Sequence, residues 1–125
     1  MAAPNLKSPT TITGKTIFTA LATTTETTLV TNSASSGKAF RVTLLAIANV
    51  DGAAAADATV TIYNLAATSG GTAFKLLHTV SVPADSTFAP IGRDASLWLE
   101  EDRRITVQAS AANDLHVILS YEEVS

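Results

Sequence analysis

KAFRVTLLAIANV, residues 38–50, carries the strongest structural signal in this chain, because its apolar residues recur at every second position. The closing stretch LHVILSYEE (residues 115–123) repeats that period. Successive side chains of a β-strand point to opposite faces of a sheet, so a period of two predicts half-buried strands. A helix would need a period near 3.6, and no segment sustains one beyond two turns.

The rest of the chain continues the period-two pattern in short segments separated by turn residues. Clusters such as SGG (69–71), PAD (83–85) and ND (113–114) favour turns through glycine freedom, fixed proline geometry or Asx hydrogen bonds. Many short strands at this spacing are typical of an all-β, antiparallel β-sandwich or jelly-roll-like fold of eight or nine strands. We predict strands over residues 16–21, 26–31, 38–50, 57–65, 73–82, 87–91, 96–100, 103–110 and 115–123.

The length of 125 residues suits one domain, with a distinct N-terminal segment. Residues 1–15 contain Pro4 and Pro9 and too few apolar residues for a helix face, so we expect an extended arm. Residues 16–125 then form the sandwich. The arm is either a frayed terminus or a segment that lies across a neighbouring subunit.

Composition narrows the classes of function. The chain has no cysteine, so disulfides and thiolate metal sites are excluded. The net charge is -3 and the lysines and arginines are scattered, which argues against nucleic acid as a partner. No stretch approaches the ~20 apolar residues that cross a membrane, and the N-terminus lacks a signal-peptide pattern. Charged residues make up only 15%, which favours an exterior partly covered by other subunits, that is, a homo-oligomer.

A catalytic, cofactor or metal site is not indicated. The sequence GKT (14–16) resembles the end of a phosphate-binding loop, but Pro9 stands where that loop needs glycine. His78 shares its predicted strand face with apolar residues and is expected at the core or its boundary, whereas His116 is expected to be exposed. The charge run EEDRR (100–104) is expected to be a solvated hairpin turn. We therefore predict no enzyme activity, no cofactor and no metal ligand.

Six residues are candidates for an interface. In the central strand, Leu45 and Ile47 fall opposite Leu44, so either a loop or the arm covers that side or it contacts another subunit. Trp98 points away from its apolar neighbours, so either it is an interface anchor or it packs under a loop. The candidates in the arm are Pro4, Leu6 and Pro9.

The order of short β-rich phrases resembles small virion structural proteins of tailed bacteriophages, especially those of marine bacteria and cyanobacteria, over about residues 13–125. The resemblance implies a non-enzymatic β-sandwich of the particle, commonly a trimeric decoration (cement) protein on the capsid exterior and otherwise a neck or tail component. It brings no catalytic residues. The phrases are SGKAFRV (36–42), ANVDG (48–52), ATVTIYN (58–64), TVSVPAD (79–85), LWLEED (97–102), ITVQAS (105–110) and SYEEVS (120–125).

Three functions follow as expectations. The first is a capsid decoration protein, a homotrimer that binds and stabilises adjacent subunits of the major capsid protein in a virion assembled in the host cytoplasm. The second is a structural protein of the neck, tail or fibre base. The third is a carbohydrate-binding jelly roll, for which the only aromatic candidates are Trp98, Tyr63 and Tyr121.

Overall fold

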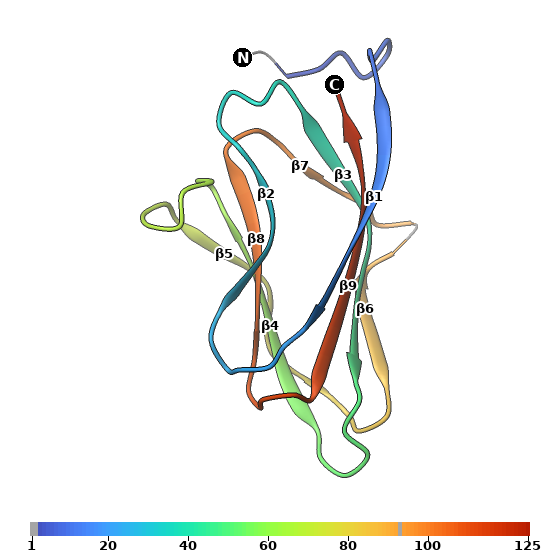
Figure 1. Cartoon of the computed structure of the whole chain (residues 1–125), viewed down its shortest axis with the longest axis vertical. Helices are drawn as coiled ribbons and strands as arrows, with labels where there is room; N and C mark the ends of the chain where they lie inside the picture. Colours follow the sequence, from blue (N-terminus) through green and yellow to red (C-terminus); the bar gives the residue numbers. More distant parts are fainter. Residues whose placement is uncertain (1–2, 93) are drawn as a thin grey trace.

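The computed structural model describes residues 3–92 and 94–125, and this part of the chain contains nine strands and no helix (Figure 1). The strands are β1 (Ile12–Ala20), β2 (Thr27–Asn32), β3 (Ala39–Asn49), β4 (Ala56–Tyr63), β5 (Ala73–Val82), β6 (Thr87–Ile91), β7 (Leu97–Leu99), β8 (Arg103–Ala109) and β9 (Leu115–Val124).

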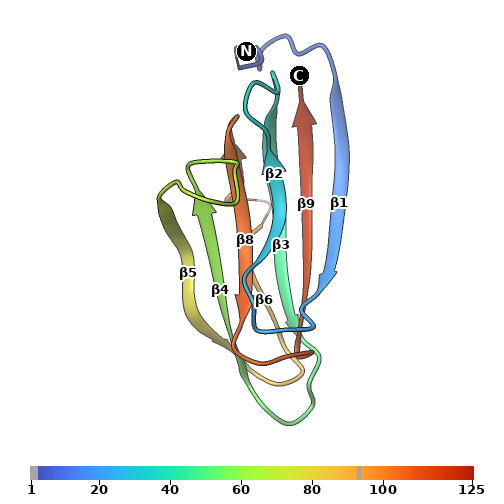
Figure 2. The same cartoon turned by 60° about the vertical axis from the view of Figure 1, so that its left-hand side comes forward.

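The strands form two sheets packed face to face (Figure 2). Sheet A has the order β1-β9-β3-β6, with β7 paired to the first half of β3, and sheet B has the order β2-β8-β4-β5. Every pair is antiparallel, and all consecutive strands except β4–β5 and β6–β7 lie in opposite sheets. This connectivity is that of a jelly roll. The predicted all-β, antiparallel sandwich is confirmed.

Each of the nine predicted segments overlaps one observed strand, and the largest difference lies at the first. β1 begins at Ile12 rather than at Thr16, because Ile12 pairs with Val124 and the ladder continues to Ala20. Residues 12–15, which we expected in the arm, therefore belong to the sandwich. β1 is an edge strand with most of its side chains exposed, so its apolar residues are too few to mark its start.

The N-terminal segment before β1 lies across the end of the sandwich that also carries the C-terminus (Figure 1). It is not fully extended, because a turn closes where the Ser8 amide donates to the Asn5 carbonyl at 3.1 Å. After this turn, the Thr10 amide donates to the Ser125 carbonyl at 2.6 Å, and the Ser125 amide donates to the Thr11 carbonyl at 3.0 Å. Backbone hydrogen bonds thus join the two terminal segments.

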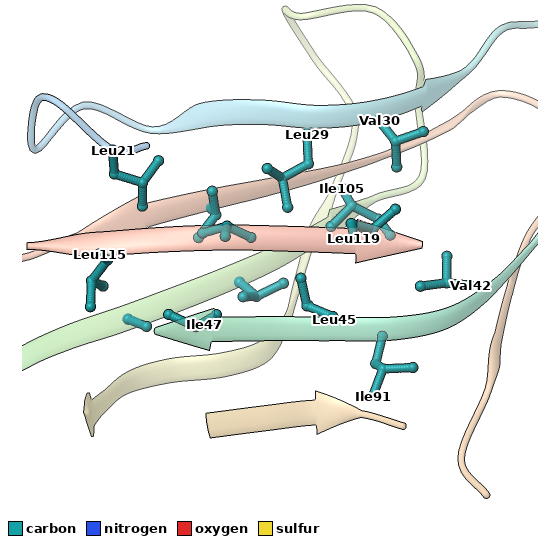
Figure 3. Packing of buried hydrophobic residues seen from close by; sticks show 14 of the residues in the cluster. Leu21, Leu29, Val30, Val42, Leu45, Ile47, Ile91, Ile105, Leu115 and Leu119 are labelled. Carbon is teal, nitrogen blue, oxygen red and sulfur yellow. The ribbon is translucent and has the colours of Figure 1, made fainter. Parts of the chain in front are cut away.

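The core lies between the sheets and is made of aliphatic side chains from both (Figure 3). Fully burying one such side chain stabilises a fold by about 1.5–3 kcal/mol. The largest side chains that are fully buried are Leu21, Leu45, Ile47, Leu99, Ile105, Leu115, Leu119, Val42, Val60, Val82, Val107 and Val117.

Buried Asn32 closes the end of the sandwich near the termini. Its side-chain amide donates to the carbonyls of Lys38 at 2.9 Å and Leu99 at 3.0 Å, and its oxygen accepts the Ser36 hydroxyl. The three contacts tie the end of β2 to the start of β3 and the end of β7. A buried carbonyl without a hydrogen-bond donor destabilises a fold, so Asn32 stabilises this end by donating to two carbonyls.

Buried Asn49 repeats the arrangement at the opposite end. Its side-chain amide donates to the carbonyls of Ala54 at 3.0 Å and Val82 at 2.9 Å, and its oxygen accepts the Asp51 amide at 2.9 Å. These bonds tie the end of β3 to the following loop and to the end of β5. Each asparagine therefore joins a local turn to a distant strand.

Candidate interaction surfaces

Three of the six predicted interface residues meet at the end of the sandwich that carries the termini. Pro4 and Leu6 lie with Trp98 around a depression of about 280 Å³, whose other lining residues are Ala3, Ala39 and Glu100. Leu6 is 52% exposed and Trp98 is 42% exposed, so both keep apolar surface available. We call this set of six residues the arm surface. Pro9 is half-buried and follows the turn, outside the lining of the depression.

The position of Trp98 follows from its strand. β7 pairs Leu97 and Leu99 with Val42 and Phe40, and Leu99 is buried in the core, which leaves Trp98 on the outer side of sheet A. The expectation that Trp98 points away from the core is confirmed. Its cross-strand partner Arg41 lies 3.8 Å from a Glu122 carboxylate oxygen. A tryptophan beside a polar rim is a common composition for a binding surface.

Leu45 and Ile47 do not lie on any surface. Both are 0% exposed and point between the sheets, so their proposed interface role is wrong (Figure 3). The physical reason is a shift in the β3–β9 register, where Val42 pairs with Tyr121 but Leu44 pairs with Ser120. The extra residue, Thr43, forms a β-bulge and reverses which alternate positions face inward. The outward-facing residues beyond the bulge are therefore Leu44, Ala46 and Ala48.

In the part of the chain that the structure describes, the outer side of sheet A keeps apolar side chains exposed, with Phe18 at 74% and Ile118 at 38%. Cross-strand pairs place Phe18 beside Ile118 and Ile118 beside Ala46, from the β1–β9 and β9–β3 ladders. Rows on either side add small or uncharged side chains. We call the following ten residues the sheet A face: Thr16, Phe18 and Ala20 of β1, His116, Ile118 and Ser120 of β9, Leu44, Ala46 and Ala48 of β3, and Thr87 of β6. His116 is exposed here, as expected.

A polar network covers part of the outer side of sheet B. The Tyr63 and Thr106 hydroxyls donate to one Glu26 carboxylate oxygen at 2.7 and 2.6 Å. Arg104 is only 5% exposed; its guanidinium carbon lies 3.7 Å from the Tyr63 ring centroid, and it donates to the Leu65 carbonyl at 2.9 Å. The expected solvated charge run is thus wrong for Arg104, because the loop after β4 covers it.

The network sets the pKa values of two of its members. The hydrogen bond from Thr106 lowers the pKa of Glu26, and the bond from Tyr63 adds to the effect. The pKa of Tyr63 is raised, first by that same hydrogen bond, since ionising the phenol would remove its donor. Both shifts hold the network in one protonation state near neutral pH. The network therefore holds the loop after β4 against sheet B.

A second ionic cluster joins β1, β9 and the residue before β3 near the termini. Lys15 lies 2.8 Å from one Glu123 carboxylate oxygen, and Lys38 bonds the other. The hydrogen bond from Lys15 and then that from Lys38 lower the pKa of Glu123. The same contact with Glu123 raises the pKa of Lys15. This cluster ties the edge strand to the sheet close to the arm surface.

His78 was expected at the core boundary but is exposed. It lines a shallow pocket of about 230 Å³ with polar residues that include Asp57, Lys75 and Gln108. The β4–β5 register shifts here, since Ala58 pairs with Val80 but Val60 pairs with Leu77. The neighbouring Thr79 takes a φ of 47°, which is rare for a β-branched residue, and its amide donates to the Thr59 hydroxyl at 3.0 Å. The irregular strand turns His78 away from the core.

The three aromatic residues proposed for a sugar platform do not converge. Trp98 belongs to sheet A and lies at the arm surface, while Tyr63 belongs to sheet B and bonds Glu26. Tyr121 is buried against Phe40, with ring centroids 4.9 Å apart. The polar pocket beside His78 contains no aromatic side chain in its lining.

Two further findings concern residues 3–92 and 94–125 only. Within them, no group of three or more histidine, aspartate or glutamate side chains is placed to hold a metal ion. No helix of this described part is long and apolar enough to span a bilayer.

Comparison with known proteins gives little further information. No family model matches the chain, and no curated protein matches it. Among solved structures, a chain from disulfide-linked pili of Bacillus endospore appendages is similar at 17% identity and a TM-score of 0.48, over 99% of this chain and 97% of that chain. A likeness at this level carries no argument, and the fold assignment rests on the strand pairing described above.

Proposed function

We propose that this chain is a non-enzymatic structural protein of a tailed-bacteriophage particle, acting as a capsid decoration (cement) protein that binds adjacent major-capsid subunits. The resemblance of its β-rich phrases to such proteins supports the assignment of the chain to a phage particle. The single observation that supports attachment is the arm surface, where Pro4 and Leu6 meet Trp98 in one apolar depression.

The arm surface has the composition that attachment needs. It offers a partly exposed tryptophan and leucine, which lose water on contact, beside the carboxylate of Glu100 and the Arg41–Glu122 pair at 3.8 Å. Aromatic anchors within a polar rim carry most of the energy of many interfaces. A cement protein repeats such a contact at every symmetric position, so modest affinities add up through multivalency.

Self-association belongs to the same proposal. A homo-oligomer, with the trimer as the expected form, would present several arm surfaces at once and multiply attachment to a repeating lattice. Its place is the virion, after assembly in the host cytoplasm.

Copy number in purified particles tests this role. Quantitative mass spectrometry of purified phage particles whose genome encodes the chain should find a copy number per particle comparable with that of the major capsid protein. A number that fits one ring on the tail axis would support instead a neck, tail or fibre-base protein. Absence from purified particles would overturn the proposal.

A further inference from the structure

The two outer sides of the sandwich differ in how they are covered. On sheet B, the Glu26 network and the loop after β4 leave Arg104 almost fully buried. On sheet A, no segment of residues 3–92 and 94–125 covers the face, and Phe18 remains 74% exposed. The chain therefore covers part of one outer side with its own residues and leaves apolar residues of the other outer side exposed. Contiguous open apolar surface usually marks an interaction site.

Charge on the sheet A face is suited to contact between identical chains. None of its ten residues is lysine, arginine, aspartate or glutamate. The chain as a whole carries a net charge of -3, so charge adds a net repulsion between two copies. Contact through these ten residues brings no like charges together, and the nearest charged pair on the same side, Arg41 and Glu122, has opposite signs. The hydroxyls of Thr16 and Ser120 already bond each other at 2.9 Å, which reduces the cost of removing water from them.

The face also carries a projection and a groove. Phe18 stands beside a groove of about 250 Å³ that is lined by Phe18, Thr19, Ala20, His116, Val117 and Ile118. An aromatic ring of one copy and the groove of another are of matching chemistry, since the lining is largely apolar. Such a surface supplies both halves of a self-complementary contact.

The size of the face sets the strength of the contact. Its residues cover about five positions on each of β1, β9 and β3, with Thr87 on β6, or roughly 300 Å² in plan from strand spacing and rise per residue. Stable complexes bury about 800 Å² on each partner, so we expect a weak contact that becomes populated as the concentration of the chain rises.

We propose that the sheet A face binds a second copy of this chain, with Phe18 of one copy packed against the β1–β9 groove of the other. The inference rests on the proposed structural role, to which it adds the surface used for self-association. It is separate from the arm surface: Phe18 pairs with Ile118, whereas Trp98 pairs with Arg41 at the far end of the sheet.

Sedimentation velocity of the full chain over a range of concentrations tests the proposal. The wild type should self-associate as its concentration rises, and Phe18→Asp should weaken that association at least about tenfold, as loss of an aromatic anchor does. Phe74→Asp is the matched control, because Phe74 is 57% exposed on β5 of sheet B, and this variant should associate like the wild type.

A second variant guards against misfolding. If Phe18→Asp loses its β-sheet circular dichroism, Ala46→Arg replaces it, since this substitution adds charge and bulk to the face without removing an apolar anchor. A monomeric wild type, or association unchanged in a folded face variant, overturns the inference. Particle copy number is unaffected by that result, so failure of the interface and failure of the structural role remain distinguishable.

Discussion

At the scale of single residues, two asparagines hold the ends of this sandwich together. In the sequence, Asn32 lies beside a run of turn residues and Asn49 lies at the end of the longest apolar stretch. Neither residue is recognisable from the sequence as important for the fold. In the fold each satisfies carbonyls on strands distant in sequence. Residue type alone cannot reveal this role, because the partner carbonyls are brought close only by the tertiary fold.

Replacing Asn49 should destabilise the chain without changing its fold. Asn49→Ala leaves the carbonyls of Ala54 and Val82 without their donor, and we expect a loss of about 2–4 kcal/mol in the free energy of unfolding. Urea unfolding followed by circular dichroism measures it. Asn5→Ala in the exposed arm is the control and should change stability by less than about 0.5 kcal/mol. Equal stability of the two variants would contradict the stabilising role of the Asn49 hydrogen bonds.

Glu123 should contribute to the loss of stability in acid. Its pKa is lowered by Lys15 and Lys38, so its stabilising effect is present above the unfolded carboxyl pKa of about 4.3 and disappears as pH falls through the lower folded value. Glu123→Gln should be less stable than the wild type at pH 7 and should lose less stability between pH 7 and pH 3. Urea unfolding at both pH values gives the comparison; an equal loss in both proteins counts against the ion pairs.

At the scale of elements, the period-two pattern predicted where the strands lie, but not their phase, that is, which alternate residues face the core. All nine segments were found, because alternation and turn residues are local signals. Three of the predicted turn segments contain a non-glycine residue in the left-handed region: Asp85, Asp102 and Asn113. The phase fails where a bulge adds a residue, as Thr43 does in β3.

A readable signal does accompany these shifts. Leu44–Leu45 and Leu76–Leu77 are doublets that interrupt the alternation, and the register shifts beside both. We interpreted the first doublet as a strand covered on both sides, which led to the wrong assignment of Leu45 and Ile47. A bulge explains a doublet equally well. Only the pairing of strands distinguishes the two explanations.

Deleting Thr43 should abolish cooperative folding. Without the bulge residue, one half of β3 must turn its buried side chains outward, either Phe40 and Val42 or Leu45 and Ile47. We expect a chain without a cooperative thermal transition. Thr43→Val keeps the residue count and is the control, which should melt cooperatively. A cooperative transition near the wild-type temperature in the deletion would show that the bulge does not set the phase.

The residues before β1 should be dispensable for folding, whereas those of β1 itself should not. Removing residues 1–9 deletes the turn but leaves the Thr10 and Thr11 hydrogen bonds and the whole of β1, so the melting temperature should change little. Removing residues 1–14 also deletes three positions of the β1–β9 ladder and should lower it clearly. Differential scanning calorimetry compares the two truncations. Similar melting of both would mean that residues 12–14 do not contribute to the sandwich.

At the scale of the whole molecule, the chain is a jelly roll with one outer side partly covered by a loop, an exposed apolar face on the other side and an apolar surface at one end. The sequence predicted part of that end surface, because Pro4, Leu6 and Trp98 were candidates and the fold brings them together. It did not predict the sheet A face. Phe18 and Ile118 lie on different strands, and their proximity depends on the β1–β9 register.

Co-sedimentation of the purified chain with capsids that lack it measures the proposed attachment to the capsid. The wild type should sediment with the capsids, and Trp98→Ala should bind about 30-fold more weakly, as expected for loss of an anchor worth about 2 kcal/mol. Phe74→Ala, which removes an exposed aromatic ring far from the arm surface, should bind like the wild type. A wild-type chain that stays in the supernatant at every concentration would contradict the account, as would equal binding by the Trp98 variant.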